Sequence, residues 1–281
     1  MLAELRKVIP SFLKRVDMPE RGEAWSGYQR ANRSAMEEVA DRLVGAEEPE
    51  PRPAVTLVDF DPDGEEKLVA AMLYPYTHLA EDQVLARVRS MGAEDKLAVV
   101  RAYAGTRANR RQKPGRALER VGYRFDVLSD YGAFRDLQRH RMLTIEWQDL
   151  SPRHGFVRPE AVDEAGRRDT FDAAMERSAE LYRALQPRFP VQAGYAVALA
   201  YRIRYVMQLN ARAALHMLEL RTGPQGHPEY RRVCQEMHRL IAEQAGHRIV
   251  AELMSFVDHG TYDLERLEAE RRAEARRATR S

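Results

Sequence analysis

Residues 209–231 read LNARAALHMLELRTGPQGHPEYR, and this stretch contains the most informative pattern in the chain. If it is helical, a row of polar side chains lies on or close to one side of the helix: Asn210, Arg212, His216, Glu219 and Arg221. The residues between them are mainly alanine, leucine and methionine, a composition that indicates burial. Buried arginines need partners, so the row is either a salt-bridged surface or a polar binding face.

A second informative segment is RHRMLTIEWQDLSPRHGF, residues 139–156. It contains an Arg-His-Arg string and, ten residues later, a Ser-Pro-Arg string, that is, Arg139, His140, Arg141, Ser151 and Arg153. Two arginines that flank a histidine supply fixed positive charge and directional donors, which suit a diphosphate or a reduced flavin. Taken alone, however, such a string in an arginine-rich chain is typical of an ordinary surface.

Taken together, the two segments resemble the flavin-dependent thymidylate synthase family. That family has Arg-His-Arg, a spacer and Ser-x-Arg, and then a late helix of the form Asn-x-Arg-x-x-x-(Asn/His)-x-x-x-Leu-Arg. It also has a glutamate upstream of its Arg-His-Arg, and Glu119 in GRALERVGYRF lies twenty residues before Arg139. The resemblance extends over roughly residues 54–245.

The resemblance implies an α/β fold, with a mixed β-sheet flanked by long helices, and a homotetramer that binds FAD where subunits meet. It implies conversion of dUMP to dTMP with methylenetetrahydrofolate and NADPH as co-substrates. No enzyme nucleophile is implied. The positions that match the family's flavin contacts are Glu119, Arg139, His140, Arg141, Asn210, Arg212 and His216. Those that match its nucleotide contacts are Asp149, Ser151, Arg153 and Arg221.

Each of these groups has a role that follows from its charge. Arg221 is the catalytic candidate, because a cation beside the pyrimidine stabilises negative charge that develops on the ring carbonyl. Arg153 and Ser151 are expected to clamp the nucleotide phosphate. Arg139 and Arg141 are expected to tune the flavin and to seat its diphosphate.

The chain also departs from the family pattern, mainly in the nucleotide half. The spacer before Ser151 is two residues longer, and Asp136 replaces a glutamine, which puts an acidic group where it would repel a phosphate. Pro114 stands where the family has a histidine, and Gly194 where it has a phosphate-binding arginine. The alternative is therefore a divergent paralogue that binds FAD or a nucleotide and acts on another pyrimidine nucleotide, or is non-catalytic.

A third possibility is an RNA-binding module, built on the basic residues Arg107, Arg110, Arg111, Lys113 and Arg116. Few aromatic side chains accompany this patch, and single-strand binding usually requires them, so we do not expect nucleic acid as the partner. The patch is equally suited to admitting an anionic cofactor. The net charge of the 281-residue chain is only +2 and favours neither reading.

The cysteine content and the hydropathy of the chain bear on the cellular compartment in which we expect it. Cys234 is the single cysteine, which excludes a disulfide framework within the chain and favours a reducing cytoplasm; we expect it to be a small buried apolar residue. No apolar run is long enough to span a membrane, and no Cys/His grouping has the spacing of a metal site.

We expect three parts: an N-terminal helical extension with the proline-rich linker EEPEPRP (1–53), a flavin-dependent thymidylate synthase-like domain (54–256) and a charged helical tail (257–281). The extension resembles the tail of a preceding domain, as in one half of a duplicated architecture, and its helix breaks at Pro10 and around 19–22. Further expected strands are 55–60, 122–130 and 142–147; helices are 82–105, 131–141, 168–186, 193–221 and 228–256. Residues 61–64 (DPDG) are expected to form a turn in which the glycine takes a positive φ.

Overall fold

The computed structural model describes residues 1–262 and 266–278, and the chain divides into two compact units, Met1–Pro51 and Arg52–Ser281. The first unit, described throughout, contains α1 (Leu2–Val8), α2 (Pro10–Leu13) and α3 (Glu23–Val44). The expected helix breaks are confirmed, because α2 begins at Pro10 and α3 begins directly after Gly22. None of these three helices buries a residue, so the core of the protein lies in the second unit.

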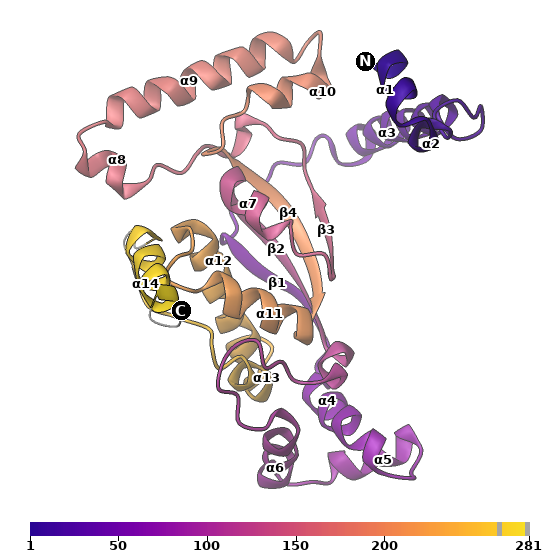
Figure 1. Ribbon diagram of the computed structural model, residues 1–281, viewed down its shortest axis with the longest axis vertical. Coiled ribbons are helices and arrows are strands. Elements are labelled where there is room, and N and C mark those ends of the chain that lie inside the picture. The colour runs from indigo at the N-terminus through magenta and orange to yellow at the C-terminus, as the bar shows by residue number, and fades with distance from the viewer. Residues whose placement is uncertain (263–265, 279–281) are drawn as a thin grey trace. The chain divides into compact units, whose positions relative to one another are not determined.

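In the described part of the second unit, four strands form one sheet in the order β1-β2-β4-β3 (Figure 1). They are β1 (Val55–Phe60), β2 (Gly122–Asp130), β3 (Leu143–Trp147) and β4 (Arg202–Asn210). Every neighbouring pair is antiparallel, whereas a mixed sheet is expected from the sequence. The predicted strands at 55–60, 122–130 and 142–147 are confirmed.

Helices cover one face of the sheet. The helices α7 (Tyr131–Leu137), α11 (Ala211–Arg221) and α12 (Pro228–Glu243) pack against its strands (Figure 1). Tyr123, Phe125 and Val127 alternate along β2 and belong to the core cluster that these helices complete. The opposite face is polar: an ion pair joins Arg204 to Asp126 there at 2.9 Å. One sheet face therefore carries the core, and the other is half-buried or exposed.

The helix expected over 193–221 is wrong in its first part, because residues 202–210 form β4. The segment alternates buried residues with more exposed ones: Tyr201, Ile203, Tyr205, Met207 and Leu209 are buried. Aromatic and β-branched residues at a period of two are typical of a strand. The helix α11 begins only after Asn210, whose side-chain oxygen accepts a 2.9 Å hydrogen bond from the Ala213 amide and so caps the helix.

Three other expected helices are shorter than predicted. The helix over 82–105 is two helices, α5 (Glu81–Arg89) and α6 (Ala93–Ala104). The helix over 131–141 ends at Leu137, so the Arg-His-Arg string lies in the loop that leads to β3. The helix over 228–256 is two helices, α12 and α13 (Arg248–Leu253). Gly246 separates them with a φ of 71°, a backbone conformation that glycine adopts without steric cost.

The turn at 61–64 is confirmed by a 2.9 Å hydrogen bond from the Gly64 amide to the Asp61 carbonyl. The expected positive φ at Gly64 is wrong, because Gly64 is the first residue of α4 (Gly64–Leu73). The glycine is needed for close packing instead. A Cβ at this position would lie 2.6 Å from Cε1 of the buried His247.

Further helices complete the second unit: α5 (Glu81–Arg89), α6 (Ala93–Ala104), α8 (Glu160–Glu164), α9 (Arg168–Leu185), α10 (Pro190–Ala193) and α14 (Arg266–Ala278). The 3-10 turns are η1 (Tyr74–Tyr76), η2 (Arg116–Arg120), η3 (Pro152–His154) and η4 (Gly194–Ala196). Parts of the expected tail, 263–265 and 279–281, lie outside the described residues. Cys234 is fully buried in α12, as expected, and burial raises the pKa of its thiol to about 12.

Candidate functional site

Arg221, the last residue of α11, joins the late helix to the loop that follows α7. Its Nε donates to Nε2 of His140 at 3.0 Å, its Nη1 to the Asp136 carboxylate at 3.2 Å and its Nη2 to the Asp136 carbonyl at 2.8 Å. The guanidinium also lies over the Tyr230 ring, 5.2 Å from the centroid. Only 14% of the Arg221 side chain is exposed. The three hydrogen bonds and the contact with the Tyr230 ring therefore hold this cation in a fixed place.

His140 is held as a neutral ring. Burial, together with the positive charges of Arg221 and other basic groups, lowers the pKa of His140 to about 4. Because Nε2 accepts the hydrogen bond from Arg221, the ring proton is assigned to Nδ1. The ring also packs edge-on against His216 from α11, with centroids 5.6 Å apart. Two predicted flavin residues from distant segments thus lie in contact.

A second pair of predicted flavin residues meets one turn earlier on α11. Arg212 donates to the Glu119 carboxylate at 3.0 Å, and Glu119 also accepts from Arg116 at 3.0 Å. The hydrogen bond from Arg116 and the charges of both arginines hold the pKa of Glu119 below its usual value. Asn210 caps α11, so its side-chain oxygen has a structural partner while its amide group remains a potential donor.

The Asp136 carboxylate, which the sequence places where it would repel a phosphate, is paired with two arginines. It receives Arg221 and also forms an ion pair with Arg139, whose side chain is 67% exposed. These two positive charges offset the repulsion that Asp136 alone would exert on a phosphate. Asp136 is therefore a charge-paired carboxylate among the described residues.

The predicted nucleotide residues other than Arg221 lie in the segment that follows β3. The Ser151 side-chain oxygen accepts a 3.4 Å hydrogen bond from the Arg153 amide and begins η3, and Asp149 precedes this turn. Within residues 1–262 and 266–278, no hydrogen bond joins Ser151 or Arg153 to Arg221 or to its partners His140 and Asp136. Of the predicted flavin residues, the structure thus joins His140 with His216 and Glu119 with Arg212. No side-chain hydrogen bond or ion pair among the described residues links Arg141 to this set, and Ser151 and Arg153 form no hydrogen bond with Arg221.

Sequence reasoning missed one buried ion pair beneath the site. Glu219 of α11 binds both terminal nitrogens of Arg107 at 2.7 Å, and the two side chains are 1% and 5% exposed. Arg107 also donates to the Leu253 carbonyl at 2.6 Å. The placement of Arg107 in an exposed basic patch is therefore wrong. A buried glutamate signals that a cation is needed, but its partner lies 112 residues away in the sequence.

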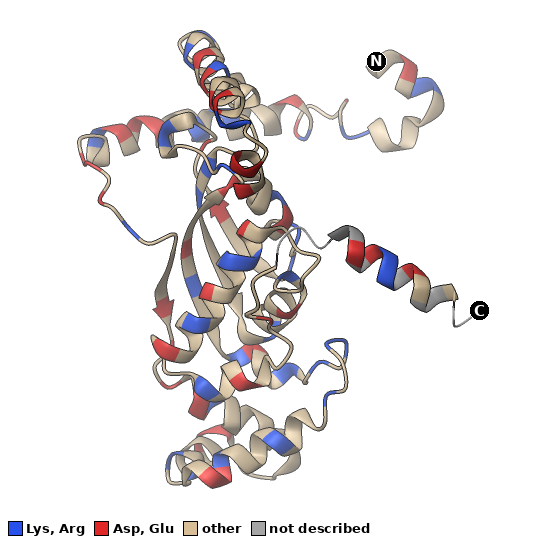
Figure 2. Ribbon diagram, turned by 90° about the vertical axis from the view of Figure 1, so that its left-hand side faces the viewer, with Lys and Arg blue, Asp and Glu red and all other residues tan. Residues whose placement is uncertain are grey.

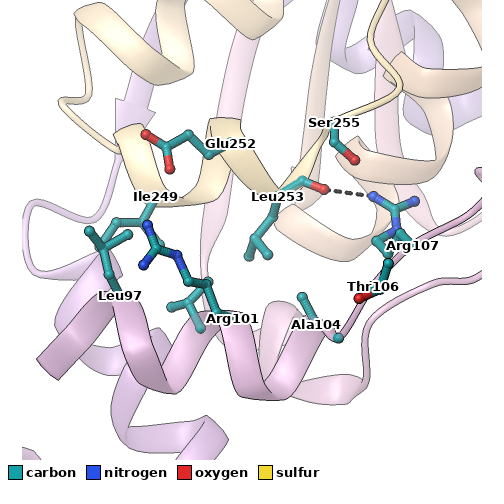
Figure 3. A pocket seen from close by; sticks show the side chains of 11 residues that line it. Leu97, Arg101, Ala104, Thr106, Arg107, Ile249, Glu252, Leu253 and Ser255 are labelled. Carbon is teal, nitrogen blue, oxygen red and sulfur yellow. Dashed lines mark hydrogen bonds between the residues drawn. The ribbon is translucent and has the colours of Figure 1, made fainter. Parts of the chain in front are cut away.

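Two cavities in the described part of the chain are lined by residues other than the predicted flavin and nucleotide residues. The first, of about 420 Å³, lies between α6 and α13, where Arg107 hydrogen-bonds the Leu253 carbonyl (Figure 3). The second, of about 700 Å³, lies between α4 and α6 and is mainly apolar.

The sequence profile of one known family, described as thymidylate synthase complementing protein, matches residues 56–246. The chain belongs to the thymidylate synthase complementing protein family. Relatives of this family member are UPF0159 proteins: one from Chlamydia pneumoniae is 38% identical over 97% of this chain and 51% of its own length. One from Thermoplasma acidophilum is 36% identical over 77% of this chain and 44% of its own length. The chain spans about half the length of these relatives.

Solved structures confirm the fold of this family member. The UMP/dUMP methylase PolB from Streptomyces cacaoi, bound with 5-Br dUMP, matches with a TM-score of 0.57 and 20% identity, over 72% of this chain and 93% of that one. Thymidylate synthase X from Helicobacter pylori, with FAD and dUMP, matches with a TM-score of 0.52 and 16% identity, over 71% and 98%. The flavin-dependent thymidylate synthase fold predicted from the sequence is therefore present.

Two negative findings concern the described part of this family member. None of its helices is both long and apolar enough to cross a membrane. No group of three or more His, Cys, Asp or Glu side chains in residues 1–262 and 266–278 is arranged to hold a metal ion.

Proposed function

We propose that this chain is a flavin-dependent thymidylate synthase, which methylates dUMP to dTMP with methylenetetrahydrofolate as carbon donor and NADPH as reductant. The observation that carries the proposal is the fixed Arg221 guanidinium, which lies in contact with the neutral His140 ring. A rigid cation at this place can stabilise negative charge on a pyrimidine carbonyl without reorganising. The names of the solved structures with this fold, a UMP/dUMP methylase and a synthase with FAD and dUMP, support a pyrimidine nucleotide as substrate.

The residues proposed to hold FAD are Glu119, Arg139, His140, Arg141, Asn210, Arg212 and His216. The contacts of His140 with His216 and of Glu119 with Arg212 support this proposal. The chemistry of these residues fits the group, because FAD carries a diphosphate and its reduced ring is anionic near N1. His140 and His216 both have pKa values lowered by burial and by neighbouring cations, so the local field is positive. Bound there, FAD would supply the hydride, while these residues hold and orient it.

On the nucleotide side, Arg221 is proposed to face the pyrimidine ring, and Ser151 and Arg153 to bind the phosphate, with Asp149 beside them. Asp136 positions Arg221 through two hydrogen bonds. We also propose that the chain forms a homotetramer with FAD where subunits meet, in a reducing cytoplasm consistent with the single cysteine.

The test is anaerobic turnover of the purified chain with FAD, NADPH, methylenetetrahydrofolate and dUMP, with dTMP measured by chromatography. Arg221→Gln should lower kcat by about 100-fold, as removal of a fixed charge-stabilising donor does, while FAD stays bound. Arg183→Gln on α9 is the control, since that side chain is exposed and pairs only with Glu176 among the described residues. Full turnover by Arg221→Gln would contradict the proposed role.

The alternative function is a divergent paralogue that uses FAD on another pyrimidine nucleotide. It is favoured by the altered segment around Ser151 and Arg153, which would contact the sugar phosphate and which forms no hydrogen bond with Arg221 among the described residues. UMP in place of dUMP in the same assay distinguishes the two functions. Methylation of UMP but not of dUMP would establish the alternative, and flavin binding without any product would favour a non-catalytic role.

A further inference from the structure

The loop between α6 and η2, residues 105–115, carries positive charge that the chain leaves without counter-charge (Figure 2). Arg110, Arg111 and Lys113 are exposed, and among the described residues no carboxylate forms an ion pair with them. Elsewhere in the second unit many arginines do pair, as Arg212 does with Glu119. The uncompensated cations of this loop therefore need an explanation outside the chain's own salt bridges.

Hydrogen bonds hold this loop in one conformation. Arg107 Nε donates to the Gln112 carbonyl at 2.6 Å, and the Gln112 amide donates to the Asn109 carbonyl at 3.1 Å. The Arg111 amide donates to the Asn109 side chain at 3.0 Å, which closes a tight turn. Its base is fixed to α11 by the buried pair of Arg107 with Glu219. The cations are thus presented on a pre-organised turn, which lowers the entropy lost on binding.

The loop lies beside the proposed flavin residues. At its far end, Arg212 of α11 contacts the Pro114 carbonyl at 3.5 Å, directly after Lys113 in the chain. The charges of Lys113 and Arg110 contribute to the lowered pKa of His216. The two cations therefore act on the same surface as the histidines of α11.

We propose that loop 105–115 is a phosphate-binding arm of the flavin site, in which Arg110 and Lys113 bind the diphosphate of the dinucleotide. This inference rests on the proposed function. Arginine gives directional, bidentate contacts to phosphate oxygens, and lysine adds a compact charge. Such an arm selects FAD over riboflavin, which has the same ring and no phosphate.

Nucleic acid fits the loop less well than a dinucleotide does. Its sequence, GTRANRRQKPG, contains no aromatic residue on which a base can stack. Arg107, the first cation of the patch, is buried and engaged with Glu219. The remaining charges span a short turn, which matches a diphosphate and not an extended backbone.

The test measures the affinity of the full chain for FAD, FMN and riboflavin by flavin fluorescence titration. The double variant Arg110→Gln/Lys113→Gln is compared with Arg177→Gln/Arg188→Gln, which removes the same charge from exposed positions at and beyond α9. We expect FAD binding to weaken about tenfold or more in the loop variant, with little change for riboflavin. The dependence of FAD affinity on salt should become shallower, and the control should bind as the wild type does.

Contrary outcomes are distinct. If the loop variant loses affinity for FAD and riboflavin equally, or keeps its FAD affinity, loop 105–115 is not a phosphate-binding arm. The proposed function would still stand. Wild-type protein that binds no flavin would overturn both. If the loop variant loses affinity for a labelled single-stranded RNA while its flavin affinities hold, the loop is a nucleic-acid surface instead. Thermal melting checks folding, and we expect no change because these side chains are exposed.

Discussion

At the scale of single residues, the buried pair of Arg107 and Glu219 fixes the base of loop 105–115 to α11. Glu219→Leu leaves the Arg107 cation buried and unpaired, so we expect a loss of about 3–5 kcal/mol in the free energy of unfolding. Arg107→Met combined with Glu219→Leu should recover most of that loss, because both charges are then absent. Urea denaturation of the two variants measures this. A double variant no more stable than the single one would contradict the argument.

His140 gives a pH dependence with a definite sign. Its folded pKa of about 4 lies below the value of about 6.5 for an ordinary histidine. The unfolded chain therefore binds more protons between these values, so the His140 contribution to stability falls as pH decreases through that window and is constant above it. His140→Gln, which can still accept from Arg221, should flatten the change in melting temperature between pH 7 and pH 4. His78→Gln, at an exposed position, should leave that slope as in the wild type.

At the scale of elements, α11 decides where the site residues lie, and Asn210 decides where α11 begins. Asn210→Ala removes the cap and should cost about 1 kcal/mol, while Asn210→Asp keeps a capping oxygen and should retain stability. The two variants separate structure from binding, since aspartate lacks the amide donor proposed for FAD. Denaturation and flavin titration on both proteins measure the two roles. Stable Asn210→Asp protein with normal FAD affinity would limit Asn210 to capping.

The same elements show how far sequence reasoning reaches. Strand β2 is predictable because Tyr123, Phe125 and Val127 alternate cleanly with polar residues. Strand β4 is not, since its arginines, Met207 and Gln208 also suit a helix, and pairing with β2 and β3 decides the outcome. The row on α11 is predictable from helical spacing alone.

At the scale of the whole molecule, the site draws on segments that the sequence cannot join. The spacing of Arg221 and His140 carries no sign that the loop after α7 folds onto the end of α11, 81 residues away. The motif resemblance assigned His140 to the flavin set and Arg221 to the nucleotide set, so their contact was not predicted either.

The solitary thiol of Cys234 has a practical consequence. The thiol is fully buried, and burial raises its pKa to about 12, so it stays protonated at neutral pH. Maleimide reagents should therefore find no reactive thiol in the native protein. A cysteine introduced on the loop that carries Arg110 would then be the one position that accepts a fluorophore. Site-specific labelling therefore does not require substitution of Cys234. Any labelling of Cys234 in the native protein would report the opening of α12.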